Sequence, residues 1–199
     1  MTGGDLTLEQ VTDVANGEYV DLAPTEILAI KNAYEAYGQL YFHHYITRKV
    51  IDPFSVQHMQ YIHHVFMKGL SKQAGLFRSD APAEKTRRSV GDLADWARES
   101  REGLLIKACV VHYELMSIMP FGEGSEYVAR LWQMCLVHQE KGDFVHVYVP
   151  VMRVLSQRRQ EYHDILAIAD KAAGRTRFVE FMLQVILDAM AEYERDSSL

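Results

Sequence analysis

The sequence is poor in the features that mark secreted, membrane or nucleic-acid-binding proteins. It has only two cysteines, Cys109 and Cys135, and both lie in apolar helical runs, where we expect reduced core residues. No apolar stretch is long enough to span a bilayer, and the first residues lack the charge and apolar run of a signal peptide. The formal net charge is −6, whereas nucleic-acid surfaces are normally basic. We therefore expect a cytoplasmic protein that binds neither membrane nor nucleic acid.

Internal repeats, low-complexity tracts and linkers are also missing. Alternating period-two runs are confined to brief pieces such as residues 144–149. Hydrophobic residues make up 48% of the 199, which is enough to bury one sizeable core. We expect residues 1–199 to form a single all-α domain.

Apolar residues recur at three-to-four spacing along most of the chain, which predicts a succession of helices. Thr7 and Gln10 form a capping-box pattern at the first start, and Pro24 suits the first turn of the second helix. A polar loop is expected over residues 78–85, and Pro150 is expected to break or delay the seventh helix. The expected helices lie within residues 6–16, 23–45, 52–70, 89–96, 104–118, 127–138, 144–168 and 175–194.

The stretch 118–130 lies between two apolar helical runs, and the run before it is apolar enough for a helix buried on nearly all sides. Pro120 ends that helix, because the residue before a proline is disfavoured in the α region. Gly122 and Gly124 permit a tight turn, and Ser125 is expected to cap the next helix. Such a loop is either an ordinary corner between helices or a phosphate-binding helix N-terminus.

The nine histidines do not form a convincing metal-binding pattern. The adjacent pairs at 43–44 and 63–64 point to different helix faces. The position one turn after His58 is Ile62, and no cysteine or carboxylate completes a zinc set. His112 is expected to be a hydrogen-bonded core histidine. The loop is not a P-loop either, because no lysine follows its glycines.

With these pieces in this order, the chain resembles the Fic family, helical enzymes that typically transfer AMP from ATP to a hydroxyl side chain of a target protein. The family signature His-Pro-Phe-x-Asp/Glu-Gly-Asn-Gly-Arg-x-x-Arg aligns with residues 119–130, Met-Pro-Phe-Gly-Glu-Gly-Ser-Glu-Tyr-Val-Ala-Arg. The resemblance implies a Fic-like helical bundle around a central buried helix, with at most a short vestigial flap. Other similar segments are the pre-motif helix (105–113), the turn entering the flap (74–78), the N-terminal helices (6–11 and 32–36) and the closing helices (158–163 and 178–183).

The resemblance also implies roles for the loop residues. Met119 occupies the position of the family's catalytic histidine, a general base, and a thioether is unsuited to that work. Glu123 keeps the acidic residue that holds Mg²⁺ against the phosphates. Gly124 and Arg130 are retained from the nucleotide-binding part of the signature, and Ser125 replaces its asparagine. We therefore expect no catalytic residue and a vestigial nucleotide-binding set.

Two substitutions alter the phosphate cradle that the resemblance implies. Glu126 replaces a glycine and brings bulk and negative charge, and Tyr127 replaces the arginine that clamps the outer phosphates. Loss of a general base costs about 10²–10⁴ in rate, and loss of a preorganised donor about 10²–10³. Such losses do not multiply fully, but a carboxylate beside a triphosphate adds repulsion. The resemblance thus implies a protein that does not transfer AMP.

Two accessory parts of the family are also expected to be missing. The inhibitory helix, with its Ser/Thr-x-x-x-Glu-Gly/Asn pattern, has no counterpart in residues 1–5. The flap hairpin, which aligns a target segment by strand addition, corresponds to a few charged residues around Pro82.

These observations favour a Fic-fold regulatory or interaction protein that needs no cofactor. The alternative is an adenylyltransferase-like enzyme with altered or residual chemistry, which would use Mg²⁺ and ATP through Glu123, Ser125 and Arg130. A plain helical interaction module is the third reading. The expected partner is a protein that the sequence does not identify, and homo-oligomerisation is left open.

Overall fold

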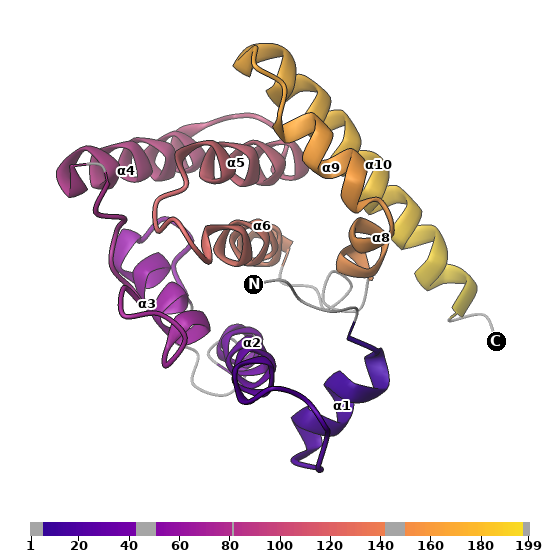
Figure 1. Cartoon of the computed structure of the whole chain (residues 1–199). Helices are drawn as coiled ribbons and strands as arrows, with labels where there is room; N and C mark the ends of the chain where they lie inside the picture. The colour runs from indigo at the N-terminus through magenta and orange to yellow at the C-terminus, as the bar shows by residue number, and fades with distance from the viewer. Residues whose placement is uncertain (1–5, 43–50, 81, 142–149, 197–199) are drawn as a thin grey trace.

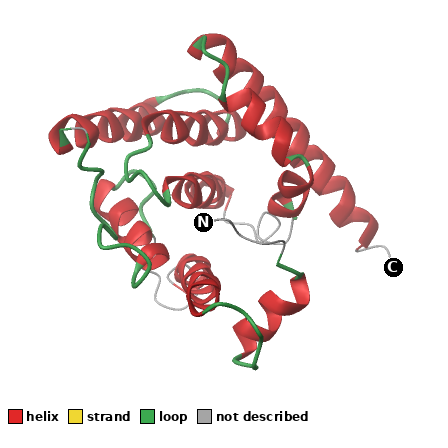
Figure 2. Cartoon of the chain, in the orientation of Figure 1, coloured by secondary structure: helices red, strands yellow, loops and turns green. Residues whose placement is uncertain are grey.

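The structure is a computed structural model that describes residues 6–42, 51–80, 82–141 and 150–196. Those residues form helices, turns and loops without a strand, which confirms the all-α class (Figure 2). No helix among them is both long and apolar enough to cross a bilayer. In chain order the helices are α1 (Leu8–Asn16), α2 (Pro24–Phe42), α3 (Val56–Met67), α4 (Ala83–Glu99), α5 (Leu104–Ile118), α6 (Ser125–Lys141), α8 (Val151–Gln157), α9 (Arg159–Leu166) and α10 (Lys171–Asp196).

The α5 and α6 helices pack against each other, and α6 lies in the middle of the helices in Figure 1. α5 also packs against α4, α9 and α10, and α6 packs against α3, whereas α1 packs on α2 and α2 on α3. The central helix was predicted to be buried, and Cys109 and His112 on it are fully shielded from solvent. One hydrophobic cluster fills the space between α3, α4, α5 and α6, and a second joins α5 to α8, α9 and α10. The loop between α5 and α6 therefore joins two closely packed helices.

The first helix begins as its sequence predicts. The Thr7 hydroxyl accepts a hydrogen bond from the Gln10 N–H at 3.2 Å, and the Gln10 side-chain oxygen accepts one from the Thr7 N–H at 2.9 Å. This reciprocal capping box satisfies two donors at the helix start. Gly17 ends the helix at φ 83°, a left-handed conformation that glycine adopts without a side-chain clash.

The start of α3 differs from the predicted one. The Asp52 carboxylate accepts a hydrogen bond from the Phe54 N–H at 2.9 Å, which makes a turn rather than a first helical residue. Ser55 then caps the helix, because its hydroxyl accepts from the His58 N–H at 3.2 Å. The helix therefore begins at Val56, a few residues later than predicted.

The α4 helix begins at Ala83, earlier than predicted, so the polar loop expected over residues 78–85 is shorter than predicted. Pro82 precedes the first turn, where a missing N–H costs no helical hydrogen bond. The sequence predicts a loop for the charged residues that follow Pro82. They instead lie on the exposed face of an amphipathic helix whose buried positions include Thr86 and Val90.

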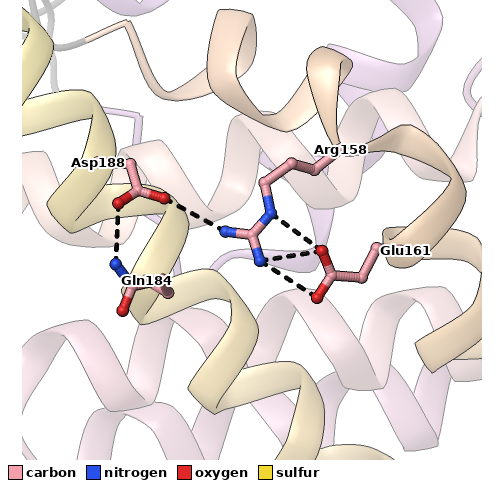
Figure 3. Close-up of polar contacts among 4 residues, drawn as sticks. All are labelled: Arg158, Glu161, Gln184 and Asp188. Atoms are coloured by element: carbon pink, nitrogen blue, oxygen red, sulfur yellow. Dashed lines mark hydrogen bonds and ion pairs between the residues drawn. The ribbon is translucent and has the colours of Figure 1, made fainter.

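The predicted helix over residues 144–168 is two helices, α8 and α9, that begin after Pro150 and meet at Arg158. The Arg158 guanidinium pairs with Glu161 on α9 and with Asp188 on α10 (Figure 3). It also lies 4.7 Å from the centroid of the Phe181 ring. This arginine therefore holds the junction of α8 and α9 against α10. Residues 144–149 of the predicted helix lie outside the described residues, as do Tyr45 and the histidines at 43–44.

The last helix begins four residues before the predicted start. The Asp170 carboxylate accepts hydrogen bonds from the N–H groups of Ala172 and Ala173, at 2.9 and 3.2 Å. An aspartate in this place is a strong N-cap, so the helix opens at Lys171.

Candidate functional site

The loop between α5 and α6 is a series of tight turns. Met119 follows the last residue of α5 with φ 47° and ψ 59°, a left-handed conformation that non-glycine residues rarely adopt. Its N–H donates to the Leu115 carbonyl at 2.9 Å, and its carbonyl accepts from the Gly122 N–H at 3.1 Å. Such strain is held in place by the surrounding structure and tends to occur at functional sites.

The His63 side chain on α3 holds this loop in place through a hydrogen bond and a ring contact. Its Nε2–H donates to the Glu123 carbonyl at 3.0 Å, and its Nδ1 accepts a hydrogen bond from the Gly75 N–H at 3.0 Å. The ring stacks on Phe121 with centroids 4.1 Å apart. The bond from Gly75 requires an unprotonated Nδ1, so His63 is neutral, and burial lowers its pKa. The sequence offered no signal for this role beyond the histidine pair at 63–64.

Gly124 is required by packing as well as by its backbone conformation. Its φ is 84°, and a Cβ there would lie 2.8 Å from Met67 Sδ and 2.9 Å from His63 Nε2. The glycine therefore allows the loop to approach α3 closely.

Ser125 does not cap α6, and the prediction of that cap is wrong. Its hydroxyl oxygen instead accepts from the Phe121 N–H at 3.0 Å, and the side chain is buried inside the loop. The Gly124 carbonyl accepts from the N–H groups of Tyr127 and Val128, which begins the helix without a side-chain cap. The sequence could not distinguish a serine that caps forward from one that bonds backward, because both suit a tight turn.

Glu126 lies in the first turn of α6 and pairs with Arg130 one turn later. The Glu126 Oε2 atom is 3.1 Å from Arg130 Nη2, and both side chains are partly exposed. The guanidinium carbon lies 5.9 Å from the centroid of the Tyr162 ring on α9. Arg130 therefore has a carboxylate on one side and an aromatic hydroxyl residue on another.

Tyr127 faces the core rather than presenting a polar group to the loop. It is half-buried, and its ring stacks on Phe66 with centroids 5.6 Å apart. Burial, and secondarily the charge of Glu126, raises its pKa, so the phenol stays neutral. A cation-binding or anion-clamping role at this position has no support from the side chain.

His112 is the hydrogen-bonded core histidine that the sequence predicted. Its Nδ1 is 2.5 Å from Gln133 Oε1, and its Nε2 is 3.0 Å from the Tyr162 hydroxyl. Complete burial lowers its pKa to about 4, so the ring is neutral over the usual pH range.

Glu123 is exposed at the tip of the loop, with its backbone carbonyl held by His63. Among the described residues, no three histidine, cysteine or acidic side chains gather into a metal-binding group. A single carboxylate suits Mg²⁺ when phosphate oxygens and water complete the octahedron. Glu123 thus fits the metal only as one ligand beside a bound nucleotide.

The structure brings Glu123, Gly124, Glu126 and Arg130 to one end of α6, beside the left-handed Met119. Ser125 belongs to the same turn but points inward. The two side chains that sequence reasoning did not single out for this region are His63 and Tyr162. Both come from helices remote in the sequence, so only the fold reveals their approach.

This arrangement of a helix pair, a glycine-bearing loop and surrounding helices resembles that of solved Fic family proteins. Residues 53–137 match the sequence model of the Fic/DOC family. A Fic family protein from Desulfovibrio desulfuricans G20 is 32% identical, with a TM-score of 0.86 over 98% of this chain and 61% of that one. These matches confirm the resemblance to the Fic/DOC family that the sequence indicated.

Two more distant structures share the fold. A fragment of Fic-1 from C. elegans is 18% identical, with a TM-score of 0.73 over 97% of this chain and 58% of that one. A Fic domain containing signaling protein from Bacteroides thetaiotaomicron VPI-5482 is 16% identical, with a TM-score of 0.74 over 95% and 80%. The chain thus spans less than two thirds of the first two structures. No curated protein matches it.

Proposed function

We propose that this Fic-fold protein does not transfer AMP and acts as a regulatory or interaction protein through its surface. The observation that carries the proposal is the absence of a usable histidine base among the described side chains around the loop. Met119 takes the position of the family's histidine, and its sulfur does not accept a proton from a hydroxyl nucleophile.

Neither histidine near the loop replaces the missing base. His63 uses one ring nitrogen to accept from Gly75 and the other to donate to Glu123. His112 is fully buried between Gln133 and Tyr162, and its lowered pKa disfavours protonation. A general base must reach the proton that it removes and accept it near the working pH. Both rings fail the first requirement, because their nitrogens are already bonded.

The charge around Arg130 supports the same proposal. The Glu126 carboxylate pairs with the guanidinium at 3.1 Å in the first turn of α6. That end of a helix favours anions, and Glu126 supplies one from within the chain. A nucleotide phosphate would have to displace this carboxylate and approach its negative charge. Glu126 thus acts as a built-in anion that excludes nucleotide.

A target-docking strand is also missing from the described part of the loop region. Residues 76–80 form loop and bend, and α4 begins at Ala83, where the family's flap would present a hairpin edge. Strand addition needs a free edge with backbone donors and acceptors. Partner contacts are therefore expected to use helical surfaces instead.

A nucleotide titration with and without Mg²⁺ tests the proposal most directly. Calorimetry on the wild type should give no binding of ATP in either condition. An assay with labelled ATP should leave no label on the protein or on a generic target after denaturation. Label that survives denaturation would overturn the proposal.

The alternative, a nucleotide-binding protein with altered chemistry, is favoured by one feature. Glu123 is exposed, and Arg130 is partly exposed on the same end of α6, so a phosphate carrying Mg²⁺ would meet both. Ser125 contributes little, since its hydroxyl is buried in the loop. ATP binding that strengthens with Mg²⁺ and weakens in Glu123→Gln would select this alternative.

A further inference from the structure

Tyr162 joins the buried core to the polar end of α6. It lies on α9, and its side chain is almost wholly shielded from solvent. Its hydroxyl is 3.0 Å from His112 Nε2, and its ring faces the Arg130 guanidinium carbon at 5.9 Å. No sequence motif or established role accounts for a polar group buried at this point.

The direction of each hydrogen bond in this core is fixed by the next one. The Gln133 amide nitrogen donates to Cys109 Sγ at 3.6 Å, so the Gln133 oxygen faces His112. That oxygen accepts only from a protonated Nδ1, and a neutral imidazole then has a bare Nε2. The Tyr162 hydroxyl must therefore give its proton to His112.

Because the proton points inward, the lone pairs of the Tyr162 oxygen are left for a donor from outside. Arg130 is the neighbouring cation: its guanidinium carbon lies 5.9 Å from the centroid of the Tyr162 ring, and its Nε atom is buried without a hydrogen-bond partner among the described residues. Burial raises the pKa of Tyr162 to about 12, and the charge of Arg130 opposes that rise. The Arg130 guanidinium has only hydrogen-bond donors, so toward Tyr162 it can act only as the donor and the Tyr162 oxygen only as the acceptor. The guanidinium thus pairs with Glu126 and has the Tyr162 ring as its neighbour from α9, while its buried Nε donor and the Tyr162 lone pairs are both unused within the part of the chain that the structure describes.

The backbone that carries Tyr162 is itself anchored. Arg158, just before α9, makes two hydrogen bonds to Glu161 and one to Asp188 of α10, and Gln184 holds the second oxygen of Asp188 (Figure 3). This network restrains α9 relative to α10. The α9 backbone that carries Tyr162 is therefore restrained by α10, through contacts that do not involve the α5–α6 loop.

We propose that Tyr162 is a positioning residue that holds the Arg130 guanidinium at the end of α6, whether or not Glu126 is present. The proposal rests on the proposed function in one respect, that Glu126 occupies an anion position. It adds that this position is preorganised by the core chain Cys109–Gln133–His112–Tyr162. Removing Glu126 then leaves a site ready for a small oxyanion such as phosphate.

The test combines two arms that use the whole chain. The first arm records the Arg130 Nε–Hε signal by NMR in the wild type, in Tyr162→Phe and in Tyr113→Phe, with no ligand. Tyr113 is a matched control, because it is equally buried, packs on the same Phe178 ring and donates its hydroxyl to the Lys171 carbonyl instead. Tyr162→Phe should shift the signal and speed its exchange with water, and Tyr113→Phe should leave it unchanged.

The second arm titrates inorganic phosphate into Glu126→Gly alone and combined with either tyrosine change. Tyr162→Phe should lower the affinity roughly tenfold, as expected for one bond to a charged group, and Tyr113→Phe should not. An Arg130 signal that ignores Tyr162→Phe, or equal effects of the two tyrosines, would overturn the inference. Absence of phosphate binding in Glu126→Gly counts against the proposed role of Glu126, and the NMR arm then decides the role of Tyr162 by itself.

Discussion

The Glu123 carbonyl accepts a hydrogen bond from His63 Nε2 at 3.0 Å, while Nδ1 of the same ring accepts one from the Gly75 N–H. One buried histidine thus ties the turn after α3 to the loop between α5 and α6. The neighbouring bond from the Arg78 N–H to the Pro120 carbonyl, at 2.9 Å, joins the same two segments. The loop keeps its shape through contacts from a distant part of the chain.

Gly124→Ala should destabilise the protein by about 2–4 kcal/mol, because the new Cβ meets Met67 and His63 and the left-handed backbone is strained. Gly91→Ala on α4 is the control, since that position is helical and has open space for a Cβ. It should be neutral or stabilise by about 0.5–1 kcal/mol. Denaturant unfolding measures both, and equal effects would show that His63 does not hold the loop closely.

Much of the fold followed from local sequence. Periodicity located α5, the capping box fixed the start of α1, and Pro24 opened α2. The predicted helix starts were wrong where a side chain can form either of two local hydrogen bonds. Asp52 makes a turn rather than a helix start, and Asp170 makes a cap that the apolar pattern did not reveal. Such choices differ by little free energy and are decided by tertiary packing.

In the candidate site, too, the local features were predictable from the sequence and the contacts between distant helices were not. The sequence located the loop and placed Glu126 in the first turn of α6, because turn residues and helix periodicity are local signals. It did not foresee the inward Ser125 hydroxyl, the clamp by His63 or the approach of Tyr162 to Arg130. These contacts join helices far apart in the chain, and no local pattern encodes them.

Met119→His alone should not restore AMP transfer. A histidine at this position would supply a base, but Glu126 would still pair with Arg130 and repel a triphosphate. Labelled ATP, with an active family member as positive control, should leave no label on the variant after denaturation. Strong labelling of Met119→His would show that the missing base is the only defect.

His112 should make the protein less stable in acid. Its pKa is lowered from 6.5 to about 4, so the unfolded chain binds a proton between these values that the folded chain does not. The free energy of unfolding is therefore unaffected by protonation of His112 above pH 6.5. It decreases as the pH falls from 6.5 toward 4, by about 3 kcal/mol in total.

Unfolding free energies measured from pH 7 to 4 for the wild type and for His112→Gln test this prediction. The difference between the two curves removes the contribution of carboxylates, which both proteins share. His163→Gln, a change at an exposed position on α9, should keep the full wild-type pH dependence. A difference curve that is flat below pH 6.5 would contradict the assignment of a neutral, buried His112.

Glu126 gives the sharpest test of the vacated anion position. Glu126→Gln removes the charge and keeps the shape, so the loss of the dipole and ion-pair contributions should cost about 0.3–1 kcal/mol at this partly exposed site. Glu126→Gly also removes the bulk and adds about 1 kcal/mol of helix cost. It should gain affinity for ATP and phosphate, and Mg²⁺ should strengthen ATP binding through Glu123. Glu84→Gly, in the exposed first turn of α4, is the matched control that should lose similar stability and gain no affinity. Calorimetry on the three variants decides the matter, and tight ATP binding by the wild type, or no gain in Glu126→Gly, would refute the role of Glu126.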